Sequence, residues 1–347
     1  MEKNAQSVCI SGYYGFDNFG DEAVLKVLVR NLKSFKNPPA VTVFSVSPKK
    51  TAEQLGVNST ETFNLKCLIP EILKSSCLIS GGGSLLQDSS SALSLLYYLF
   101  VIALAEASGR KVFIFAQGIG PVKNPLLKNL MFFLLRRADY ITVRDDNSFN
   151  LLKSRGINRI SKCSDPVWNI DVKKNVHQNR IGVQLRKCSI STDEFIKKLA
   201  QNINKYYSDK EIYILSFQNS YDMEVCRKLK SELYIVNPEI KAQVIPNTSI
   251  EKTLSALASC GAIIAMRYHA CLAAVKAGIK LLPVNYDIKV KALADEFNLK
   301  CINSIDDMDS AFKEFNGRSI NYDMKKICSK KFDFSVLEKF LNGSSGQ

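Results

Sequence analysis

Two basic side chains lie where a predicted strand passes into a predicted helix. The segment "IIAMRYHACLAAVKAG" runs from an apolar strand through Arg267 and His269 into a helix rich in alanine. A cation at a helix N-terminus opposes the helix dipole, so stability alone argues against this placement. A bound anion relieves the conflict, because a guanidinium forks around a carboxylate or a phosphate. The alternative, an exposed arginine beside a packed histidine, leaves the dipole conflict unexplained.

Other charged side chains follow predicted strands in the same way. Carboxyl ends of parallel strands share one edge of a sheet, so we expect these groups to converge on a small ligand with several negative charges. The predicted anion-binding residues are Arg144, Arg186, Arg267, His269 and Lys289. The neighbours Arg144 and Asp145 also fit a structural pair. Histidine exchanges protons near neutral pH, which suits His269 for acid–base catalysis together with Arg267. The accompanying base is Asp17, Asp88 or Asp287, and Asp287 is the one we place at the anion site.

Three glycine-containing loops follow predicted strands in the first half of the chain. In "SGYYGFDNFGDEAV" the glycine spacing does not fit G-x-G-x-x-G, and no P-loop motif occurs in the chain. Asp21 is expected to cap the following helix. This role leaves the aromatic pair Tyr13–Tyr14 and the amide of Asn18 available to a ligand. Aromatic faces pack on pyranose rings and amides bind hydroxyl groups. The predicted acceptor-binding residues of the three loops are Tyr13, Tyr14, Asn18, Gly82, Gly83, Gln87, Asp88 and Gln117.

Alternating strand and helix patterns must position these loops. The expected strands are Val8–Ile10, Val41–Val46, Cys77–Ile79, Val112–Ala116, Tyr140–Val143, Ile181–Leu185, Ile212–Phe217, Ala262–Ala265 and Leu281–Val284. The expected helices are Glu22–Phe35, Ala92–Ala107, Pro125–Arg137, Asp193–Asn204, Ile250–Ser259, Cys271–Ala277 and a basic segment at Tyr322–Leu341 before a polar tail. A polar stretch at Asp171–Asn179 looks like a linker. This order predicts an α/β protein with two Rossmann-like, doubly wound domains, 1–172 and 179–347, facing a cleft.

The net charge indicates the class of partner, and the cysteines indicate the redox compartment. The formal net charge of +14 over 347 residues implies a polyanionic partner. The basic residues are spread along the chain without a nucleic-acid motif, so we expect no nucleic acid. No apolar run reaches the ~18–20 residues of a membrane span, and the polar N-terminus does not resemble a signal peptide. Ten cysteines without a C-x-x-C pair indicate a reduced, cytoplasmic chain, and no metal site is expected.

The loops as a set resemble the polysaccharide pyruvyl transferase family, most closely its cell-surface-anchoring (CsaB-type) branch. The matching pieces lie in order between Ser11 and about Phe297. They are "GYYGFDNFGDEA", "GGGSLLQD", "QGIGP", "VRDDNS", "DPVW", the Arg-Tyr-His segment followed by Ala, and "YDIKV". One departure is Leu93-Ser94-Leu95, where relatives tend to carry Arg-Ser-Leu. This difference puts the identity of the sugar that is bound in question more than that of the anionic ligand.

The resemblance implies a GT-B-like fold and a reaction. An enolpyruvyl unit would pass from phosphoenolpyruvate, the co-substrate, to a sugar, forming a pyruvyl ketal and releasing phosphate without a cofactor. In the cell-surface branch the acceptor is an N-acetylmannosamine residue of a lipid-diphosphate-linked wall-polymer precursor. The alternative is a GT-B glycosyltransferase that uses a sugar nucleotide.

A lipid-linked acceptor would bring the protein to a membrane. The helix expected at Pro125–Arg137 has an apolar centre, of which Leu130, Leu134 and part of Phe132–Phe133 are expected to face the sheet. The basic residues Lys123, Lys128, Arg136 and Arg137 flank it. Lys and Arg are attracted to anionic lipid. We therefore expect peripheral association with the inner face of the cytoplasmic membrane.

Overall fold

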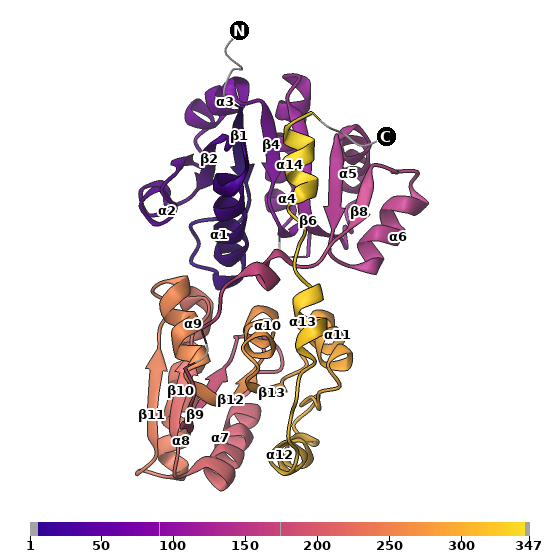
Figure 1. Ribbon diagram of the computed structural model, residues 1–347. Coiled ribbons are helices and arrows are strands. Elements are labelled where there is room, and N and C mark those ends of the chain that lie inside the picture. Colours follow the sequence, from indigo (N-terminus) through magenta and orange to yellow (C-terminus); the bar gives the residue numbers. More distant parts are fainter. Residues whose placement is uncertain (1–5, 90, 174, 344–347) are drawn as a thin grey trace. The chain divides into compact units, whose positions relative to one another are not determined.

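The computed structural model describes residues 6–89, 91–173 and 175–343 (Figure 1). These residues form two compact units, each with its own parallel sheet. Unit 1 contains the described residues of Met1–Phe16, Gly20–Asn169 and Lys330–Gln347, and unit 2 contains Asp17–Phe19 and Ile170–Ser329. The change of unit at residue 170 lies close to the linker expected from the sequence.

The sheet of unit 1 is doubly wound. Its strand order is β3-β2-β1-β4-β6-β7-β8, with β5 paired to β6. The strands are β1 (Ser7–Ser11), β2 (Ala40–Ser45), β3 (Asn58–Glu61), β4 (Cys77–Ser80), β5 (Gly83–Leu86), β6 (Lys111–Ile119), β7 (Tyr140–Val143) and β8 (Ile160–Lys162). The order reverses between β1 and β4, where such sheets bind ligands beyond the strands' carboxyl ends. The loops that begin at Gly12 and Gly81 therefore lie at this switch point.

Helices cover the sheet of unit 1. They are α1 (Phe19–Ser34), α2 (Pro48–Leu55), α3 (Leu65–Lys74), α4 (Ala92–Ala107), α5 (Pro125–Arg137), α6 (Asp146–Ser154) and α14 (Ser335–Leu341), with a short 3-10 turn η1 at Pro166–Asn169. Buried side chains of α3, α4 and α5 share one apolar cluster with the central strands. Polar caps set where two of these helices begin: Ser91 Oγ accepts from Ser94 N at 3.3 Å and Asn124 Oδ1 from Leu126 N at 2.9 Å.

The C-terminal segment belongs to unit 1 (Figure 1). Asn169 and Phe332 exchange two hydrogen bonds, of 3.0 and 2.7 Å. The ring of Phe332 lies 4.9 Å from that of Phe115, and the ring of Phe340 lies 5.0 Å from that of Phe113. The expected second domain, residues 179–347, therefore includes a segment that the structure assigns to the first unit, because its aromatic side chains are buried there.

The sheet of unit 2 repeats the doubly wound order, β11-β10-β9-β12-β13. Its strands are β9 (His177–Gln184), β10 (Glu211–Leu215), β11 (Lys241–Ile245), β12 (Cys260–Ala265) and β13 (Lys280–Pro283). Its helices are α7 (Asp193–Tyr207), α8 (Asn219–Val236), α9 (Ile250–Ala258), α10 (Tyr268–Lys276), α11 (Ile288–Glu296), α12 (Met308–Gly317) and α13 (Met324–Ser329). The switch point lies between β9 and β12, and the residues that follow these strands include Arg186 and Arg267.

Most expected elements are confirmed, with differences at their ends. Every strand expected from the sequence overlaps an observed one, and α4 has the expected bounds. β9 begins at His177, inside the expected linker, and α10 begins three residues earlier than expected. The basic segment at Tyr322–Leu341 forms two short helices, α13 and α14, rather than one. Of the expected polar tail, residues 344–347 lie outside the described residues.

Candidate functional site

In unit 2, Arg267 is held by a buried carboxylate. Its Nε and Nη2 donate to the two oxygens of Asp222 at 2.8 and 2.5 Å, and Nη2 also donates to Gln218 Oε1 at 3.3 Å. Asp222 is fully buried and also accepts from the backbone amides of Phe217 and Gln218, both at 3.0 Å. The conflict between Arg267 and the helix dipole is thus relieved inside the protein by Asp222. The sequence analysis expected a bound anion in this role and did not include an internal carboxylate.

Arg186 and Tyr286 lie beside this pair. Arg186 follows β9, and its Nη1 donates to the Tyr286 hydroxyl at 3.3 Å, with the guanidinium 5.5 Å from the ring centre. Burial raises the pKa of Tyr286, and the charges of Arg186 and Arg267 oppose that shift. The structure therefore brings together two predicted anion-binding residues from β9 and β12. The side-chain partner of Arg186 is a neutral phenol, whereas that of Arg267 is a carboxylate.

His269 and Asp287 lie at the first turns of two helices that follow strands. His269 is in the first turn of α10, half-buried, and its ring packs edge-on against Tyr268 at 5.2 Å. Asp287 caps α11, accepting from the Lys289 backbone amide at 2.8 Å. Asp287 is half-buried and acts electrostatically on Tyr286. Lys289 is half-buried on the same turn. Sequence reasoning missed the role of Asp222, although an acid in the first turn of a helix after a strand is a visible signal.

In unit 1, Arg144 is part of a buried ion pair. Its Nη1 donates to Asp165 Oδ2 at 2.6 Å and its Nη2 to Ser84 Oγ at 3.2 Å. Asp165 also accepts from the Val167 backbone amide at 2.9 Å. Asp145, the sequence neighbour of Arg144, instead caps α6. Arg144 thus ties the glycine loop after β4 to the "DPVW" turn, and it belongs to a different unit from the other predicted anion-binding residues.

The glycine loop of unit 1 is packed against the preceding loop. A Cβ on Gly81 would lie 1.9 Å from the Tyr14 hydroxyl, and a Cβ on Gly82 would lie 2.8 Å from a methyl group of Val24. Gly83 has φ +124°, and its Cβ would lie 2.9 Å from Asp21 Oδ1. These positions are glycine because the side chains of Tyr14, Val24 and Asp21 fill the space that a Cβ would need. The sequence analysis explained the glycines only by contact with a ligand.

Several predicted acceptor-binding residues have structural partners. Tyr14 is fully buried, and Gln117 is buried, with its amide bonded to the Gly81 carbonyl and the Leu85 amide at the switch point. Asp88 accepts from the backbone amides of Lys123 and Asn124 at 2.8–2.9 Å, which holds its pKa below the usual range. These side chains are bonded within the protein rather than left open for a ligand, because buried polar groups in tight loops need hydrogen-bond partners.

Four predicted acceptor-binding residues are half-exposed, Asp88 and the following three. Tyr13 stacks on Phe16 with ring centres 4.0 Å apart, Asn18 lies in the tripeptide grouped with unit 2, and Gln87 accepts from Ser89 N at 2.6 Å. Stacked aromatic rings and amides at the carboxyl end of a sheet suit a polar ligand with a flat apolar face. Tyr13, Asn18 and Gln87 are accordingly, with Asp88, the predicted acceptor residues with accessible surface, and the Asp88 carboxylate is already bonded to backbone amides.

The packing of Tyr14 leads to a stability prediction. Its hydroxyl is buried and has no hydrogen-bond partner among the described residues. An unpaired buried hydroxyl costs free energy, so Tyr14→Phe should leave the free energy of unfolding unchanged or raise it by up to about 1 kcal/mol. Gly81→Ala should lower it by about 1–3 kcal/mol, because the new methyl group overpacks the site. In the double variant Tyr14→Phe/Gly81→Ala part of that loss should be recovered, and urea unfolding measures all three. A drop of about 2 kcal/mol or more in Tyr14→Phe would mean that the hydroxyl is satisfied.

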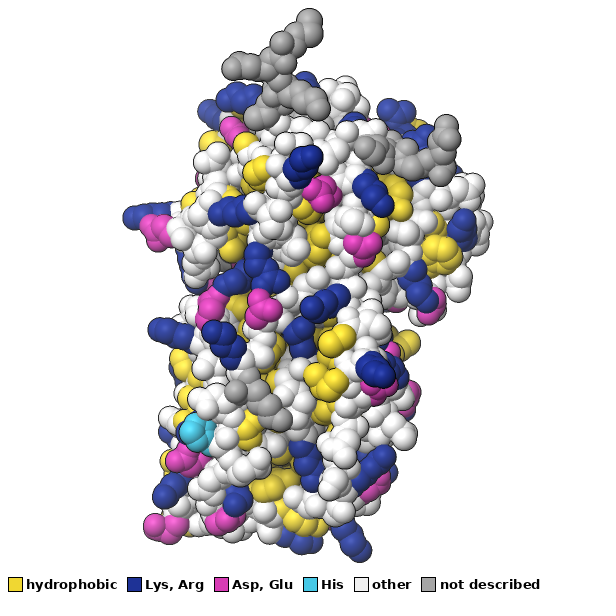
Figure 2. All heavy atoms as spheres, in the orientation of Figure 1, with side chains coloured by type: hydrophobic (Ala, Val, Ile, Leu, Met, Phe, Trp, Pro, Cys, Tyr) yellow, Lys and Arg dark blue, Asp and Glu magenta, His cyan; other side chains and the backbone are white. Residues whose placement is uncertain are grey.

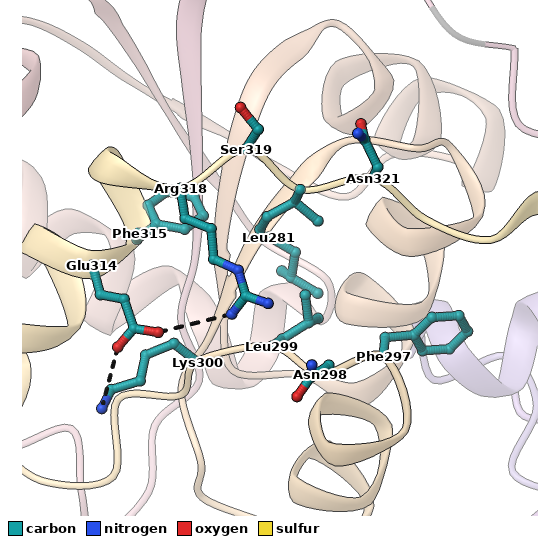
Figure 3. Close-up of a pocket in the computed structure, with 11 residues that line it drawn as sticks. Leu281, Phe297, Asn298, Leu299, Lys300, Glu314, Phe315, Arg318, Ser319 and Asn321 are labelled. Carbon is teal, nitrogen blue, oxygen red and sulfur yellow. Dashed lines mark ion pairs between the residues drawn. The ribbon is translucent and has the colours of Figure 1, made fainter.

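A pocket of about 300 Å³ lies elsewhere in unit 2 (Figure 3). Leu281, Leu299 and Phe315 provide apolar lining, and Glu314 forms ion pairs with Lys300 at 3.6 Å and Arg318 at 3.8 Å. Leu281 lies near the amino end of β13, whereas Tyr286 and Asp287 follow the carboxyl end. The pocket is therefore separate from the cluster of strand-end residues.

Four features outside the strand-end cluster bear on what the protein could bind: metal ligands, apolar helices, surface charge and cysteines. Within the described ranges, no three His, Cys, Asp or Glu side chains are placed to hold a metal ion. None of the helices in the described parts is long and apolar enough to cross a bilayer. On the face in Figure 2, Lys and Arg side chains are scattered and mixed with Asp and Glu rather than gathered in one stripe. Burial raises the pKa of Cys9 to about 12, so this thiol stays protonated and packs as a small apolar group.

Comparisons with known proteins relate this arrangement to others. A family model described as "Polysaccharide pyruvyl transferase" matches residues 18–288. A search of curated protein sequences returns no match. Among solved structures, UDP-GlcNAc 2-epimerase from Methanocaldococcus jannaschii has a TM-score of 0.66 at 11% identity, over 98% of this chain and 99% of that one.

Two further solved structures have the same fold. The S. aureus MnaA–UDP co-structure has a TM-score of 0.65 at 12% identity, over 97% of each chain. Anabaena Alr3699/HepE in complex with UDP-glucose has a TM-score of 0.63 at 10% identity, over 97% of this chain and 98% of that one. At such identities the likeness shows the fold alone, which is GT-B-like.

Proposed function

Because this chain belongs to the polysaccharide pyruvyl transferase family, we propose that it transfers an enolpyruvyl unit from phosphoenolpyruvate to a sugar. The sugar is part of a cell-wall or surface-polysaccharide precursor, the product is a pyruvyl ketal, and phosphate is released. The observation that carries the proposal is the group of cationic strand-end residues in unit 2.

The donor site is proposed in unit 2 around Arg186 and His269. Phosphoenolpyruvate carries a carboxylate and a phosphate on one carbon, and both suit a guanidinium and a helix N-terminus. Arg186 contacts a neutral phenol, so its positive charge is not neutralised by the group to which it donates. Arg267, paired with Asp222 and positioned at the start of α10, is also part of the proposed donor set. Lys289, on α11, completes the proposed donor set of unit 2.

The reaction requires one proton donor and one base. A proton is added to the methylene carbon of the donor, and a sugar hydroxyl oxygen attacks the adjacent carbon as its positive charge develops. The bond to phosphate then breaks, and a second hydroxyl closes the ketal. Of the two hydroxyl protons, one is retained in the new methyl group and the other leaves with phosphate. We assign the acid to His269 and the base to Asp287, because both follow the carboxyl ends of the paired strands β12 and β13.

The acceptor site is proposed in the strand-end loops that contain Tyr13, Asn18 and Gln87. Their half-exposed rings and amides fit a sugar with free hydroxyl groups. We further propose a lipid-diphosphate-linked wall-polymer precursor as the acceptor, as in the cell-surface-anchoring branch. That acceptor would place the protein on the inner face of the cytoplasmic membrane as a peripheral protein, which accords with the basic charge of the chain.

Arg186 gives this proposal a direct prediction. Arg186→Gln should raise KM for phosphoenolpyruvate by about 10–100-fold, because a hydrogen bond between charged partners is worth roughly 1.5–3 kcal/mol. Steady-state phosphate release at varied donor concentration measures it. Lys187→Gln is the matched control, since Lys187 is the exposed neighbour paired with Glu224 at 2.7 Å. Equal KM values for the two variants would remove Arg186 from the donor site.

A sugar-nucleotide-dependent glycosyltransferase is the second candidate function. It is favoured by the likeness to Alr3699/HepE, whose structure contains UDP-glucose, and to MnaA, whose structure contains UDP. The two candidates are separated by offering one acceptor with either phosphoenolpyruvate or a UDP-sugar. Phosphate release with the first donor supports pyruvyl transfer, and UDP release with the second supports glycosyl transfer.

A further inference from the structure

Two neighbouring helices of unit 1 expose apolar side chains in regular stripes. On α4, Leu93, Leu96 and Phe100 are exposed at spacings of three and four residues, with Leu93 78% exposed. On α5, Leu126, Leu130 and Phe133 repeat the pattern, with Leu126 77% exposed. The other sides of both helices are buried in the core of unit 1. A water-facing helix surface is normally polar, so these stripes need a partner.

The two stripes belong to one surface, because α4 and α5 pack on each other. Arg137 on α5 donates to Glu106 on α4 at 3.0 Å and lies 5.7 Å from the Phe133 ring. We call this surface the α4–α5 face. The expectation that Leu130 faces the sheet is wrong, whereas Leu134 and Phe132 are buried as expected.

Basic side chains outnumber acidic ones on the α4–α5 face. Lys123, Arg136 and Arg137 are exposed at or beside α5, and Lys128 is half-exposed on it. Glu106 is the one acid in the sequences of α4 and α5, and its side chain, only 7% exposed, is paired with Arg137. Asp88, which precedes α4, is bonded to backbone amides near α5. The face thus combines apolar stripes with an excess of basic side chains.

We infer that the α4–α5 face docks onto an anionic lipid bilayer, with its apolar stripes in the interface and its basic residues at the headgroups. This inference rests on the proposed function, because a lipid-linked acceptor is delivered at that surface. α4 also begins four residues after Asp88, so the face starts beside the proposed acceptor loop. A second copy of the chain is the poorer occupant, because a two-fold contact would oppose the same cations.

Sedimentation of the full chain with vesicles tests the inference without any donor or acceptor. Vesicles of phosphatidylcholine with phosphatidylglycerol are compared with phosphatidylcholine alone, at low and high salt. Wild-type protein should bind the anionic vesicles at low salt. Leu93→Gln/Leu126→Gln should lower the partition coefficient about ten-fold or more, because two exposed leucines no longer enter the interface. Ile235→Gln, at a position in α8 that is 73% exposed, is the matched control and should bind like wild type.

The contribution of the basic residues to vesicle binding is tested in the same way. Lys123→Gln/Arg136→Gln should lower binding to anionic vesicles about ten-fold, and Lys49→Gln/Lys50→Gln on α2 should change it little. Wild-type protein that ignores anionic vesicles, or a leucine variant that binds as wild type does, would overturn the inference. So would wild-type dimerisation that the leucine variant abolishes without any lipid binding. Since no catalysis is measured, failure here is distinct from failure of pyruvyl transfer.

Discussion

His269→Ala should lower kcat for pyruvyl transfer by about 10²–10⁴-fold, the usual contribution of a positioned acid–base group. The imidazole lies in the first turn of α10, after β12, at the end of the sheet where Arg186 follows β9. The melting temperature should change little, because the ring is half-buried and packs edge-on against its neighbour Tyr268. Phosphate release under saturating donor and a thermal melt measure the two quantities.

The chain supplies a matched control for this variant. His177 is the other histidine of the sequence, and it is exposed at the start of β9. His177→Ala should keep full activity and an unchanged melting temperature. If His269→Ala unfolds, a packing role for the ring is the better account, and His269→Gln, which preserves much of the volume, then separates packing from proton transfer. A folded His269→Gln variant with wild-type kcat would exclude the acid role.

Arg267→Ala should destabilise the protein by about 3–5 kcal/mol, because it leaves the carboxylate of Asp222 buried without its cation. Asp222 is fully buried and accepts two hydrogen bonds from the guanidinium. For a unit of this size such a loss corresponds to a fall of roughly 10 °C in the melting temperature. Calorimetry of the variant measures it. Arg267→Lys keeps the charge but not the fork, so it should be destabilised by less.

A double-mutant cycle separates this effect from general damage. If the pair is the cause, Asp222→Ala/Arg267→Ala should be destabilised by clearly less than the sum of the two single variants, because neither partner is then left alone. Additive losses would mean that the two residues act independently. Lys187→Ala is a useful comparison, since both side chains of its ion pair with Glu224 are exposed and the pair should contribute little.

The fold was largely predictable from the sequence because strand and helix periods alternate clearly. Apolar runs such as Tyr140–Val143 and the largely apolar helix Ala92–Ala107 coincide with observed elements. Polar edge strands were not found: β3 has the sequence "NSTE" and β8 is three residues long. Such strands bury little, so their sequences have no apolar pattern to detect.

The candidate site was predictable in position and less so in detail. Strand ends indicated where Arg186, Arg267 and Asp287 would lie. Sequence spacing did not reveal that Asp222, 45 residues before Arg267, would neutralise it in the folded chain. It also did not show that Tyr14 turns inward against Gly81. Both are tertiary contacts between loops of different strands, and no local pattern encodes them.

Pyruvyl transfer itself is tested most directly by the mass of the product. The protein is incubated with phosphoenolpyruvate labelled with ¹³C in the pyruvyl carbons and with a lipid-linked disaccharide containing N-acetylmannosamine. If the chain is a pyruvyl transferase, the acceptor gains the labelled mass of pyruvic acid less one water, and one phosphate is released per acceptor consumed. His269→Ala should give neither signal, and His177→Ala should give both. An acceptor that gains an unlabelled sugar only when a UDP-sugar is supplied, and is unchanged with phosphoenolpyruvate, would contradict the account.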